Sequence, residues 1–280
     1  MKRPASRLPC RPHPHLYEIN TLVWLHELSQ KTNRMIHLGD VPDQEWDNLE
    51  EKGFDCIWLM GIWERSPYSR SVAQDDRRLQ KEYDHALPGW QPHDVMGSPY
   101  AIRSYRPNPN IATWDQLDRV LEKLHQRGML LILDFVPNHT SVDHDWVRTH
   151  PEYYIQRTTK NAEHSEPGFF KTDLGNKALY LAHGKDPYFP PWTDTAQLNY
   201  FHEETRASMV QELKKVAQHC DGVRCDMAML VLNDIFEKTW SDLLGTRRRP
   251  HDEFWTEALA AISDSDFIWI AEVYWDLEWT

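Results

Sequence analysis

The chain has 280 residues, of which 40% are hydrophobic and 26% charged, so it is long enough to bury one sizeable core. Its formal net charge of −12 argues against nucleic acid or an anionic membrane as a partner, because both attract basic surfaces. No segment approaches the roughly 20 apolar residues that cross a bilayer, and Met1–His15 lacks the apolar stretch of a secretory signal, so we expect a cytoplasmic protein.

Five short apolar segments recur along the chain, and they are rich in the β-branched and aromatic residues of strands buried on both faces. The predicted strands are residues 19–25, 54–60, 129–136, 222–227 and 267–273. A helix-like segment precedes every strand after the first; the one before the second strand lies near residues 43–52. This alternation predicts a parallel sheet with right-handed crossovers.

The helices predicted before the third and fourth strands have the clearest patterns. Thr113 can cap the first of them, Gln116 completes a capping box, and Gly128 ends the helix just before the strand. Its apolar face consists of Leu117, Val120, Leu121 and Leu124. The apolar face of the second helix consists of Met209, Val210, Leu213, Val216 and Ala217. Both faces have the spacing of a helix that packs against a core.

Two connections are too long to be plain crossover helices. Residues 61–111 carry many prolines and polar residues, and residues 138–198 contain five prolines. Connections of this length are usually functional or form a small subdomain. The chain also has 13 tryptophans, and although aromatic faces stack well on sugar rings, we expect most of them to fill or flank the core.

Carboxylates lie where three of the predicted strands end, at Asp134, Asp226 and Glu272. The carboxyl ends of parallel barrel strands form an active-site mouth, so converging acids there indicate a reaction centre. Arg224 lies two residues before Asp226 and points to the same face of the strand, where its charge favours the ionised carboxylate of a nucleophile. Glu272 follows an apolar run, which favours the protonated form of an acid catalyst. One such acid alone would more often be a helix cap or a surface ion pair.

Three stretches resemble the conserved regions of the α-amylase family (glycoside hydrolase family 13), in the same order and at the corresponding strands. They are residues 134–139 (DFVPNH), 222–226 (GVRCD) and 271–274 (AEVY). The likeness extends from about Leu16 to Thr280. It implies an α/β fold of the (β/α)8 TIM-barrel type, incomplete and limited to the first five strands. Residues 1–137 and 199–280 would form the barrel parts, and residues 138–198 an inserted B domain after the third strand.

The resemblance implies a catalytic role for three of these residues. Asp226 matches the nucleophile that forms a covalent glycosyl–enzyme, and Glu272 matches the general acid that later acts as the base. Arg224 matches the residue that orients the nucleophile. Two carboxylates about 5 Å apart would give retention of the anomeric configuration.

The same resemblance assigns neighbouring residues to the sugar in the reacting subsite. His139 would hydrogen-bond one of its hydroxyl groups, Tyr100 would lie under its ring, and Asp134 would support Arg224. Asn138 matches a calcium ligand of many family members, while other members have no calcium. Because calcium takes about six to eight oxygens, one amide oxygen is not a site. We therefore expect no required cofactor and consider calcium an optional ligand at Asn138.

The sequence departs from the family at three places. The family has a third catalytic acid in an Asn-His-Asp segment at the seventh strand, and no such segment occurs before Thr280. We expect a truncated sequence with open sheet edges, and little or no activity from this polypeptide alone. Residues 227–230 replace the Lys-His pair of typical starch-cleaving α-amylases, which argues against starch endohydrolysis. Ser104 stands before Tyr105 where an acid is expected.

These features predict a retaining glycoside hydrolase that acts on α-glucosidic bonds of oligo- or polysaccharides, with an α-glucan or α-glucoside as its partner. A transglycosylase or isomerase of the same family, such as a trehalose-synthase-like enzyme, would use the same residues. A non-catalytic, amylase-like sugar-binding protein is a second alternative; the absent third acid favours it and the intact Asp226–Glu272 pair opposes it. A third is an unrelated barrel enzyme that uses these acids in metal-assisted hydrolysis.

Overall fold

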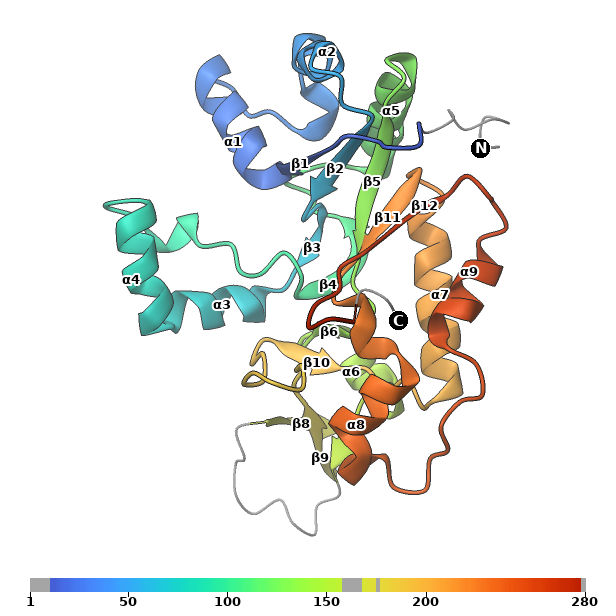
Figure 1. The fold of residues 1–280 in the computed structure, drawn as a ribbon. Helices are drawn as coiled ribbons and strands as arrows, with labels where there is room; N and C mark the ends of the chain where they lie inside the picture. Colours follow the sequence, from blue (N-terminus) through green and yellow to red (C-terminus); the bar gives the residue numbers. More distant parts are fainter. Residues whose placement is uncertain (1–10, 158–167, 175–176, 278–280) are drawn as a thin grey trace.

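The computed structural model describes residues 11–157, 168–174 and 177–277, and a parallel sheet lies at its centre. The sheet has the strand order β1 (Leu16–Asn20), β2 (Cys56–Met60), β5 (Leu130–Phe135), β11 (Gly222–Cys225) and β12 (Ile268–Ala271). Every pairing between these neighbours is parallel (Figure 1). The predicted parallel sheet is confirmed, with its strands arranged side by side in chain order.

The first strand is shorter and earlier than the sequence pattern predicted. β1 ends at Asn20, and the helix α1 (Thr21–Thr32) takes up most of the segment predicted as a strand at residues 19–25. The Asn20 side chain accepts a hydrogen bond from Val23 N at 3.4 Å, which caps the helix. Its buried residues Thr21, Leu25 and Leu28 recur at helical spacing, so the apolar run belongs to a helix face rather than to a strand.

The remaining crossover helices agree with the predicted pattern. They are α2 (Asp43–Glu51), α5 (Trp114–Gln126) and α7 (Glu203–Val216), with α8 (Asn233–Leu244) and α9 (Phe254–Ala261) before β12. The capping box of α5 is present: Thr113 N donates to Gln116 Oε1 at 2.8 Å, and Gln116 N donates to Thr113 Oγ1 at 3.3 Å. Figure 1 shows α7 and α9 beside β11 and β12. In the described part of the chain, no helix has the length and apolar character needed to cross a membrane.

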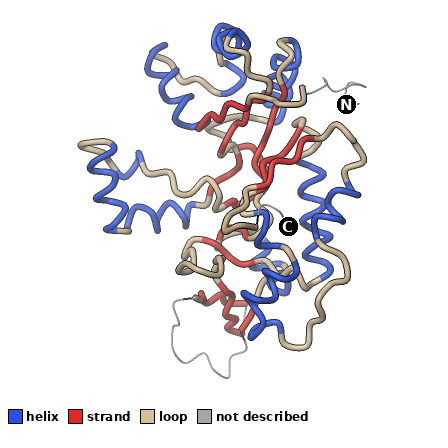
Figure 2. Tube along the Cα trace, viewed as in Figure 1, coloured by secondary structure: helices blue, strands red, loops and turns tan. Residues whose placement is uncertain are grey.

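The first long connection forms a small hairpin sheet and a helical arm. β3 (Trp63–Arg65) pairs antiparallel with β4 (Ile102–Pro107). Between them lie α3 (Pro67–Asp75) and α4 (Arg77–Ala86), which project from the body of the molecule (Figures 1 and 2). Short 3-10 helices lie at Leu38–Asp40 and Pro92–Asp94.

The second long connection contains two small antiparallel sheets. β6 (His139–Ser141) pairs with β10 (Thr195–Gln197), next to the short helix α6 (Trp146–Thr149) and the 3-10 turn Pro151–Tyr153. The other sheet has the order β7 (Gln156–Arg157), β9 (Lys177–Ala182) and β8 (Phe169–Leu174). Residues 158–167 and 175–176, also within the predicted inserted domain, lie outside the described residues.

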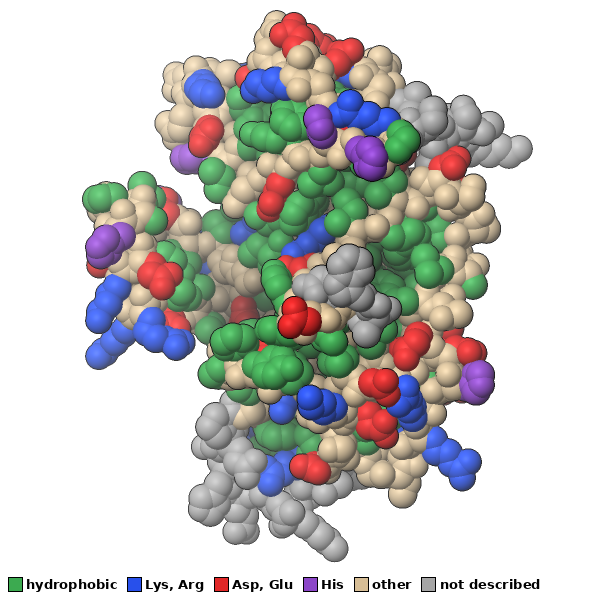
Figure 3. All heavy atoms as spheres, in the orientation of Figure 1, with side chains coloured by type: hydrophobic (Ala, Val, Ile, Leu, Met, Phe, Trp, Pro, Cys, Tyr) green, Lys and Arg blue, Asp and Glu red, His purple; other side chains and the backbone are tan. Residues whose placement is uncertain are grey.

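The two faces of the central sheet have different environments. Side chains that point toward the helices join the main core, among them Ile57, Leu131, Leu133 and Val223. Side chains on the opposite face form a smaller apolar cluster of Cys56, Leu130 and Ile132, with Trp58, Ile268 and Ile270 half-buried against it. In Figure 3, basic and acidic side chains lie in a hollow that hydrophobic side chains surround.

Candidate active site

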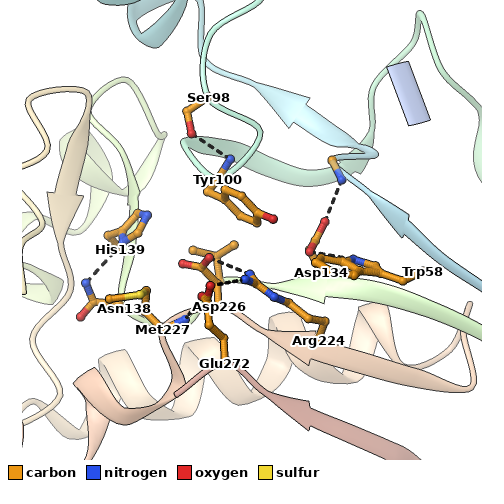
Figure 4. Close-up of polar contacts among 12 residues, drawn as sticks. Trp58, Ser98, Tyr100, Asp134, Asn138, His139, Arg224, Asp226, Met227 and Glu272 are labelled. Atoms are coloured by element: carbon orange, nitrogen blue, oxygen red, sulfur yellow. Dashed lines mark hydrogen bonds and ion pairs between the residues drawn. The ribbon is translucent and has the colours of Figure 1, made fainter. Parts of the chain in front are cut away.

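The register of the parallel strands brings four charged side chains together. Asp134 on β5 lies directly opposite Arg224 on β11, so both side chains point to the same face. Asp226 and Glu272 follow the last residues of β11 and β12, and their backbone N–H groups still donate to the neighbouring strand at 2.8 and 3.0 Å. The four residues predicted from separate motifs therefore meet at one edge of the sheet (Figure 4).

Arg224 holds both predicted catalytic acids. Its Nη1 lies 2.8 Å from Asp226 Oδ1, and its Nη2 lies 2.5 Å from Glu272 Oε1. The guanidinium carbon lies 5.1 Å from the ring centroid of Trp58 and 5.1 Å from that of Tyr100. Two carboxylates and two aromatic rings thus fix the orientation of this buried cation.

Asp226 is buried, and its surroundings act on its ionisation in opposite directions. Burial raises the pKa of Asp226 to about 7; Arg224 opposes this shift, and the negative charge of Glu272 adds to it. The prediction that Arg224 lies beside the nucleophile is in keeping with this geometry. Arg224 favours the ionised carboxylate, in the predicted direction, but desolvation works against it and is the larger effect.

Glu272 does not lie in an apolar pocket. Besides Arg224, its carboxylate accepts a hydrogen bond from Met227 N at 2.8 Å and one from the hydroxyl of Tyr274 at 2.8 Å. Met227 has the left-handed backbone angle φ 44°, which turns its N–H toward Glu272. The apolar run that precedes Glu272 belongs to β12, so the sequence pattern described the strand rather than the surroundings of the carboxylate.

Asp134 ties the ends of two strands together. Its carboxylate accepts hydrogen bonds from Trp58 Nε1 at 3.0 Å and from Gly61 N at 2.7 Å. Burial raises the pKa of Asp134 to about 6, against the Gly61 hydrogen bond and the nearby positive charge of Arg224. Asp134 therefore acts on Arg224 through its charge and through Trp58, which touches both residues.

Tyr100 and His139 lie beside the carboxylates, on two different connections. The backbone N–H of Tyr100 donates to Ser98 Oγ at 3.2 Å, and its ring covers Arg224. His139 is buried on β6, 5.2 Å from the Trp192 ring. Burial lowers the pKa of His139 to about 4, and a hydrogen bond with the Tyr100 backbone opposes this shift. His139 is therefore neutral at physiological pH and bonded to the Tyr100 segment.

Asn138 accepts hydrogen bonds from a neighbouring side-chain amide. Gln197 Nε2 donates to the Asn138 side-chain oxygen at 3.0 Å and to its backbone oxygen at 3.0 Å. Among the residues that the structure describes, there is no group of three or more His, Cys, Asp or Glu that could hold a metal ion. No step proposed below passes through a metal. Calcium as an optional ligand at Asn138 stays a prediction.

The structure shows what surrounds the two smaller departures from the family pattern, at Ser104 and in the segment after Asp226. Ser104 Oγ donates to Glu64 Oε2 at 2.6 Å, so the acid absent from position 104 has a counterpart on the neighbouring strand β3. The apolar segment Ala228–Val231 forms a short 3-10 helix whose residues are all buried. It therefore offers no side chain to a leaving group.

Several residues of the site were not predicted from the sequence. Trp58 and Gly61 at the end of β2 bind Asp134, and Tyr274 binds Glu272. The alternation of side chains along a strand could have placed Trp58 on the same face as Glu18, because the two lie opposite each other in β1 and β2. Tyr274 ends the stretch 271–274 that resembles the family, but no role was predicted for it, because its hydrogen bond to Glu272 depends on the turn after β12.

At the carboxyl ends of the parallel strands, a buried arginine lies between two carboxylates. This arrangement is typical of the active site of an α/β-barrel enzyme that uses carboxylates in catalysis. Comparison with known sequences identifies the family to which the chain belongs. Residues 43–279 match the family model described as "Alpha amylase, catalytic domain", and the chain belongs to the α-amylase family, glycoside hydrolase family 13. The fold is accordingly part of a (β/α)8 barrel, and an unrelated barrel enzyme is ruled out.

Curated relatives include several glycosidases. The trehalose-6-phosphate hydrolase of Bacillus subtilis is 27% identical over 63% of this chain and 32% of its own length. The oligo-1,6-glucosidase of Bacillus cereus is 27% identical over 65% of this chain and 29% of its own length. The α-glucosidase of Apis mellifera is 24% identical over 80% of this chain and 38% of its own length. The chain thus spans about a third of the length of these relatives.

Solved structures share the fold. The isomaltulose synthase of Erwinia rhapontici, solved with D-glucose, has a TM-score of 0.58 and 17% identity over 93% of this chain and 44% of its own. The α-amylase of Geobacillus thermoleovorans, solved with acarbose, has a TM-score of 0.54 and 18% identity over 94% of this chain and 47% of its own. At these identities the likeness establishes the fold alone.

Proposed function

We propose that this chain carries the nucleophile and the acid–base residue of a retaining glycosidase that cleaves α-glucosidic bonds. The supporting observation is the Arg224 fork, which binds Asp226 and Glu272 through its two terminal nitrogens. Two carboxylates that share one planar guanidinium lie close together. This favours the separation of about 5 Å found in retaining enzymes over the roughly 6.5–9.5 Å of inverting ones.

In the proposed reaction, Asp226 attacks the anomeric carbon while Glu272 transfers its proton to the departing glycosidic oxygen. The bond between C1 and that oxygen breaks, and a bond between C1 and Asp226 forms. Glu272 then removes a proton from water, the water oxygen attacks C1, and the bond to Asp226 breaks. The two displacements together retain the anomeric configuration. Arg224 stabilises the negative charge that returns to Asp226 in the second step.

The neighbouring residues suit a neutral sugar ring at this position. Tyr100 offers an aromatic face beside the carboxylates, and His139 is a neutral imidazole rather than a cation. The relatives named as glucosidases and hydrolases of α-glucosides support an α-glucoside as the substrate class. The buried apolar segment Ala228–Val231 supports a short α-glucoside over internal cleavage of starch.

The nucleophile is tested by covalent trapping with 5-fluoro-α-D-glucosyl fluoride and intact-protein mass spectrometry. We expect one added glycosyl group, located on Asp226 by peptide mapping. Asp226→Asn should abolish the labelling. Glu272→Gln should retain it, because fluoride leaves without a proton, and should remove any slow turnover of maltose, whose leaving group needs one. Asp242→Asn, an equivalent change at an exposed position on α8, is the matched control.

The outcomes also separate the alternative functions. Labelling at Asp226 with transfer of glucose to added sugar instead of water would indicate a transglycosylase or isomerase. Sugar binding without any labelling would indicate a non-catalytic sugar-binding protein and contradict the proposal. Labelling at a different carboxylate would contradict the assignment of Asp226.

A further inference from the structure

The carboxylate of Glu272 is held by three groups, one of which belongs to the turn that follows β12. The hydroxyl of Tyr274 donates a hydrogen bond to Glu272 Oε1 at 2.8 Å. Arg224 Nη2 lies 2.5 Å from the same oxygen. Among the described residues, Glu272 Oε2 accepts one hydrogen bond, from Met227 N at 2.8 Å. The two carboxylate oxygens therefore have different surroundings.

This difference decides which oxygen of Glu272 can carry a proton. A carboxylate oxygen has two lone pairs. On Oε1 the Tyr274 hydroxyl uses one of them, and the positive charge of Arg224 opposes a proton nearby. On Oε2 a lone pair remains beside the hydrogen bond from Met227. A proton on Glu272 is therefore favoured on Oε2.

The turn after β12 contains two consecutive non-glycine residues in the left-handed region. Trp275 has φ 64° and Asp276 has φ 61°. Met227, whose N–H binds the other oxygen of Glu272, has φ 44°. The fourth such residue in the described part of the chain is Asn33, which ends α1. Strained backbone of this kind concentrates at functional sites, and here three of the four residues lie around Glu272.

Contacts with the second long connection hold this turn in place. The Trp275 ring makes an edge contact with the ring of Tyr188, with centroids 4.8 Å apart and an interplanar angle of 66°. Tyr188 lies in a fixed loop, because the buried carboxylate of Asp186 accepts hydrogen bonds from the backbone N–H groups of Tyr188 and Phe189 at 2.7 and 2.9 Å. The loop around Tyr188 thus supports the turn that binds Glu272.

Burial in the core does not account for the position of Tyr274. Its side chain is exposed, with 45% of the residue accessible to solvent. The side chain of Glu272 is 18% exposed, against 7% for that of Asp226, so water can reach Glu272 more easily. Removal of the Tyr274 hydroxyl should leave stability almost unchanged, because substitutions at exposed positions usually do. A role in the reaction can therefore be separated from a role in folding.

We propose that Tyr274 is a positioning residue for the acid–base steps. Its hydroxyl fixes the Glu272 carboxylate so that Oε2 carries the proton, first given to the glycosidic oxygen and then taken from water. This inference rests on the proposed function for the role of Glu272. Tyr274 acts through Glu272, so its loss should slow the steps that need Glu272 and spare those that do not.

The glycosyl–enzyme trapped with 5-fluoro-α-D-glucosyl fluoride separates these steps, because intact-protein mass spectrometry follows its formation and its decay. Formation needs no proton from Glu272, so Tyr274→Phe should label at the normal rate. Decay in water needs Glu272 as the base, and Tyr274→Phe should prolong the half-life roughly tenfold. The rise of the decay rate with pH should also move to higher pH, because the lost hydrogen bond favoured the ionised carboxylate.

Azide distinguishes a positioning role from a structural one. It forms its bond to C1 as an anion and needs no base, while the bond between C1 and Asp226 breaks and Asp226 regains its negative charge. Added azide should therefore release the sugar from the wild-type protein and from Tyr274→Phe at equal rates. Tyr68→Phe removes the hydroxyl of another exposed tyrosine, on α3, and should change neither formation nor decay.

The hydrogen bond itself is tested without any reaction. The bond to Glu272 is the main cause that raises the pKa of the Tyr274 hydroxyl. In an NMR titration of protein labelled with 13C-tyrosine, the Tyr274 signal is assigned by its loss in Tyr274→Phe. It should titrate at lower pH in Glu272→Gln than in the wild-type protein, because the negative charge beside the hydroxyl is gone.

Three results would overturn the inference while labelling of Asp226 upholds the proposed function. They are normal decay of the label in Tyr274→Phe, slow decay that azide does not restore, and a Tyr274 titration that Glu272→Gln leaves unchanged. A chain that does not label at Asp226 loses the proposed function. The positioning role is then lost with it, even where the titration shows the hydrogen bond.

Discussion

Asp226 illustrates the conflict between function and stability at a single residue. Its folded pKa of about 7 lies well above the value of about 3.9 for an unfolded aspartate. Between about pH 4 and pH 7 the folded chain keeps a proton that the unfolded chain has lost. The free energy of unfolding therefore decreases as pH rises through this window, and the loss is complete above pH 7. Asp134, with a pKa of about 6, acts in the same direction.

Asp226→Asn is accordingly expected to stabilise the protein at pH 8. The amide removes a buried charge, and Arg224 keeps Glu272 as a partner. We expect a rise in Tm of roughly 2–4 °C at pH 8, equivalent to about 1 kcal/mol, and little change at pH 4.5, where Asp226 is already protonated. Differential scanning calorimetry of this variant and of Asp242→Asn at both pH values measures the effect. A lower Tm at pH 8 would show that the pair with Arg224 outweighs the burial of the charge.

Arg224 is expected to be irreplaceable by lysine. A lysine has one terminal nitrogen and cannot bind both carboxylates in the plane between Trp58 and Tyr100. Arg224→Lys should slow the covalent labelling of Asp226 by about 100-fold, as expected for misplaced reacting groups. Arg148→Lys, at an exposed position on α6, should label at the normal rate. Normal labelling of Arg224→Lys would show that only the positive charge matters.

At the scale of elements, the turn after β2 supports the site. Gly61 has φ +77°, its N–H donates to Asp134, and a Cβ there would lie 2.9 Å from Pro99 Cβ. Gly53 has nearly the same φ of +78°, but a Cβ there would meet nothing within 4 Å. The two glycines therefore differ in crowding rather than in backbone conformation.

Gly61→Ala should consequently destabilise the protein more than Gly53→Ala. Both substitutions carry the left-handed penalty of roughly 1–2 kcal/mol. The crowding at Gly61 adds about 1–3 kcal/mol. Chemical denaturation with urea compares the two variants, and equal midpoints would show that Pro99 and Arg65 move aside without cost.

The elements differed in how well the sequence predicted them. Buried strands such as β5 and the capped helix α5 were predictable because local signals and burial agree there. The segment at residues 19–25 was not, since a short apolar run fits a strand and a helix face equally well. The α3–α4 arm carried no strong signal, because none of the residues of α4 is buried.

At the scale of the molecule, sequence reasoning located the charged residues but not their environments. Parallel strands end at one edge, so Asp134, Arg224, Asp226 and Glu272 could be expected to meet. The desolvation of Asp226 depends on residues brought together by the fold, and the hydrogen bond from Tyr274 to Glu272 depends on the turn after β12. Motifs specify which groups are present, whereas burial and turns decide what surrounds each group.

The open sheet leads to a final prediction about the 280-residue polypeptide. Within the described residues, β1 and β12 each have only one neighbour, and Ile268 and Ile270 on the face opposite the helices are half-buried. Unpaired edges and partly exposed apolar side chains promote association. We expect this polypeptide to associate with rising concentration in analytical ultracentrifugation. Ile268→Lys should reduce the association, because a charge on this face opposes packing. Met35→Lys is the control and should not reduce it, because Met35 is 76% exposed and lies on another part of the surface. A monomer at all concentrations would show that this face is stable in water by itself.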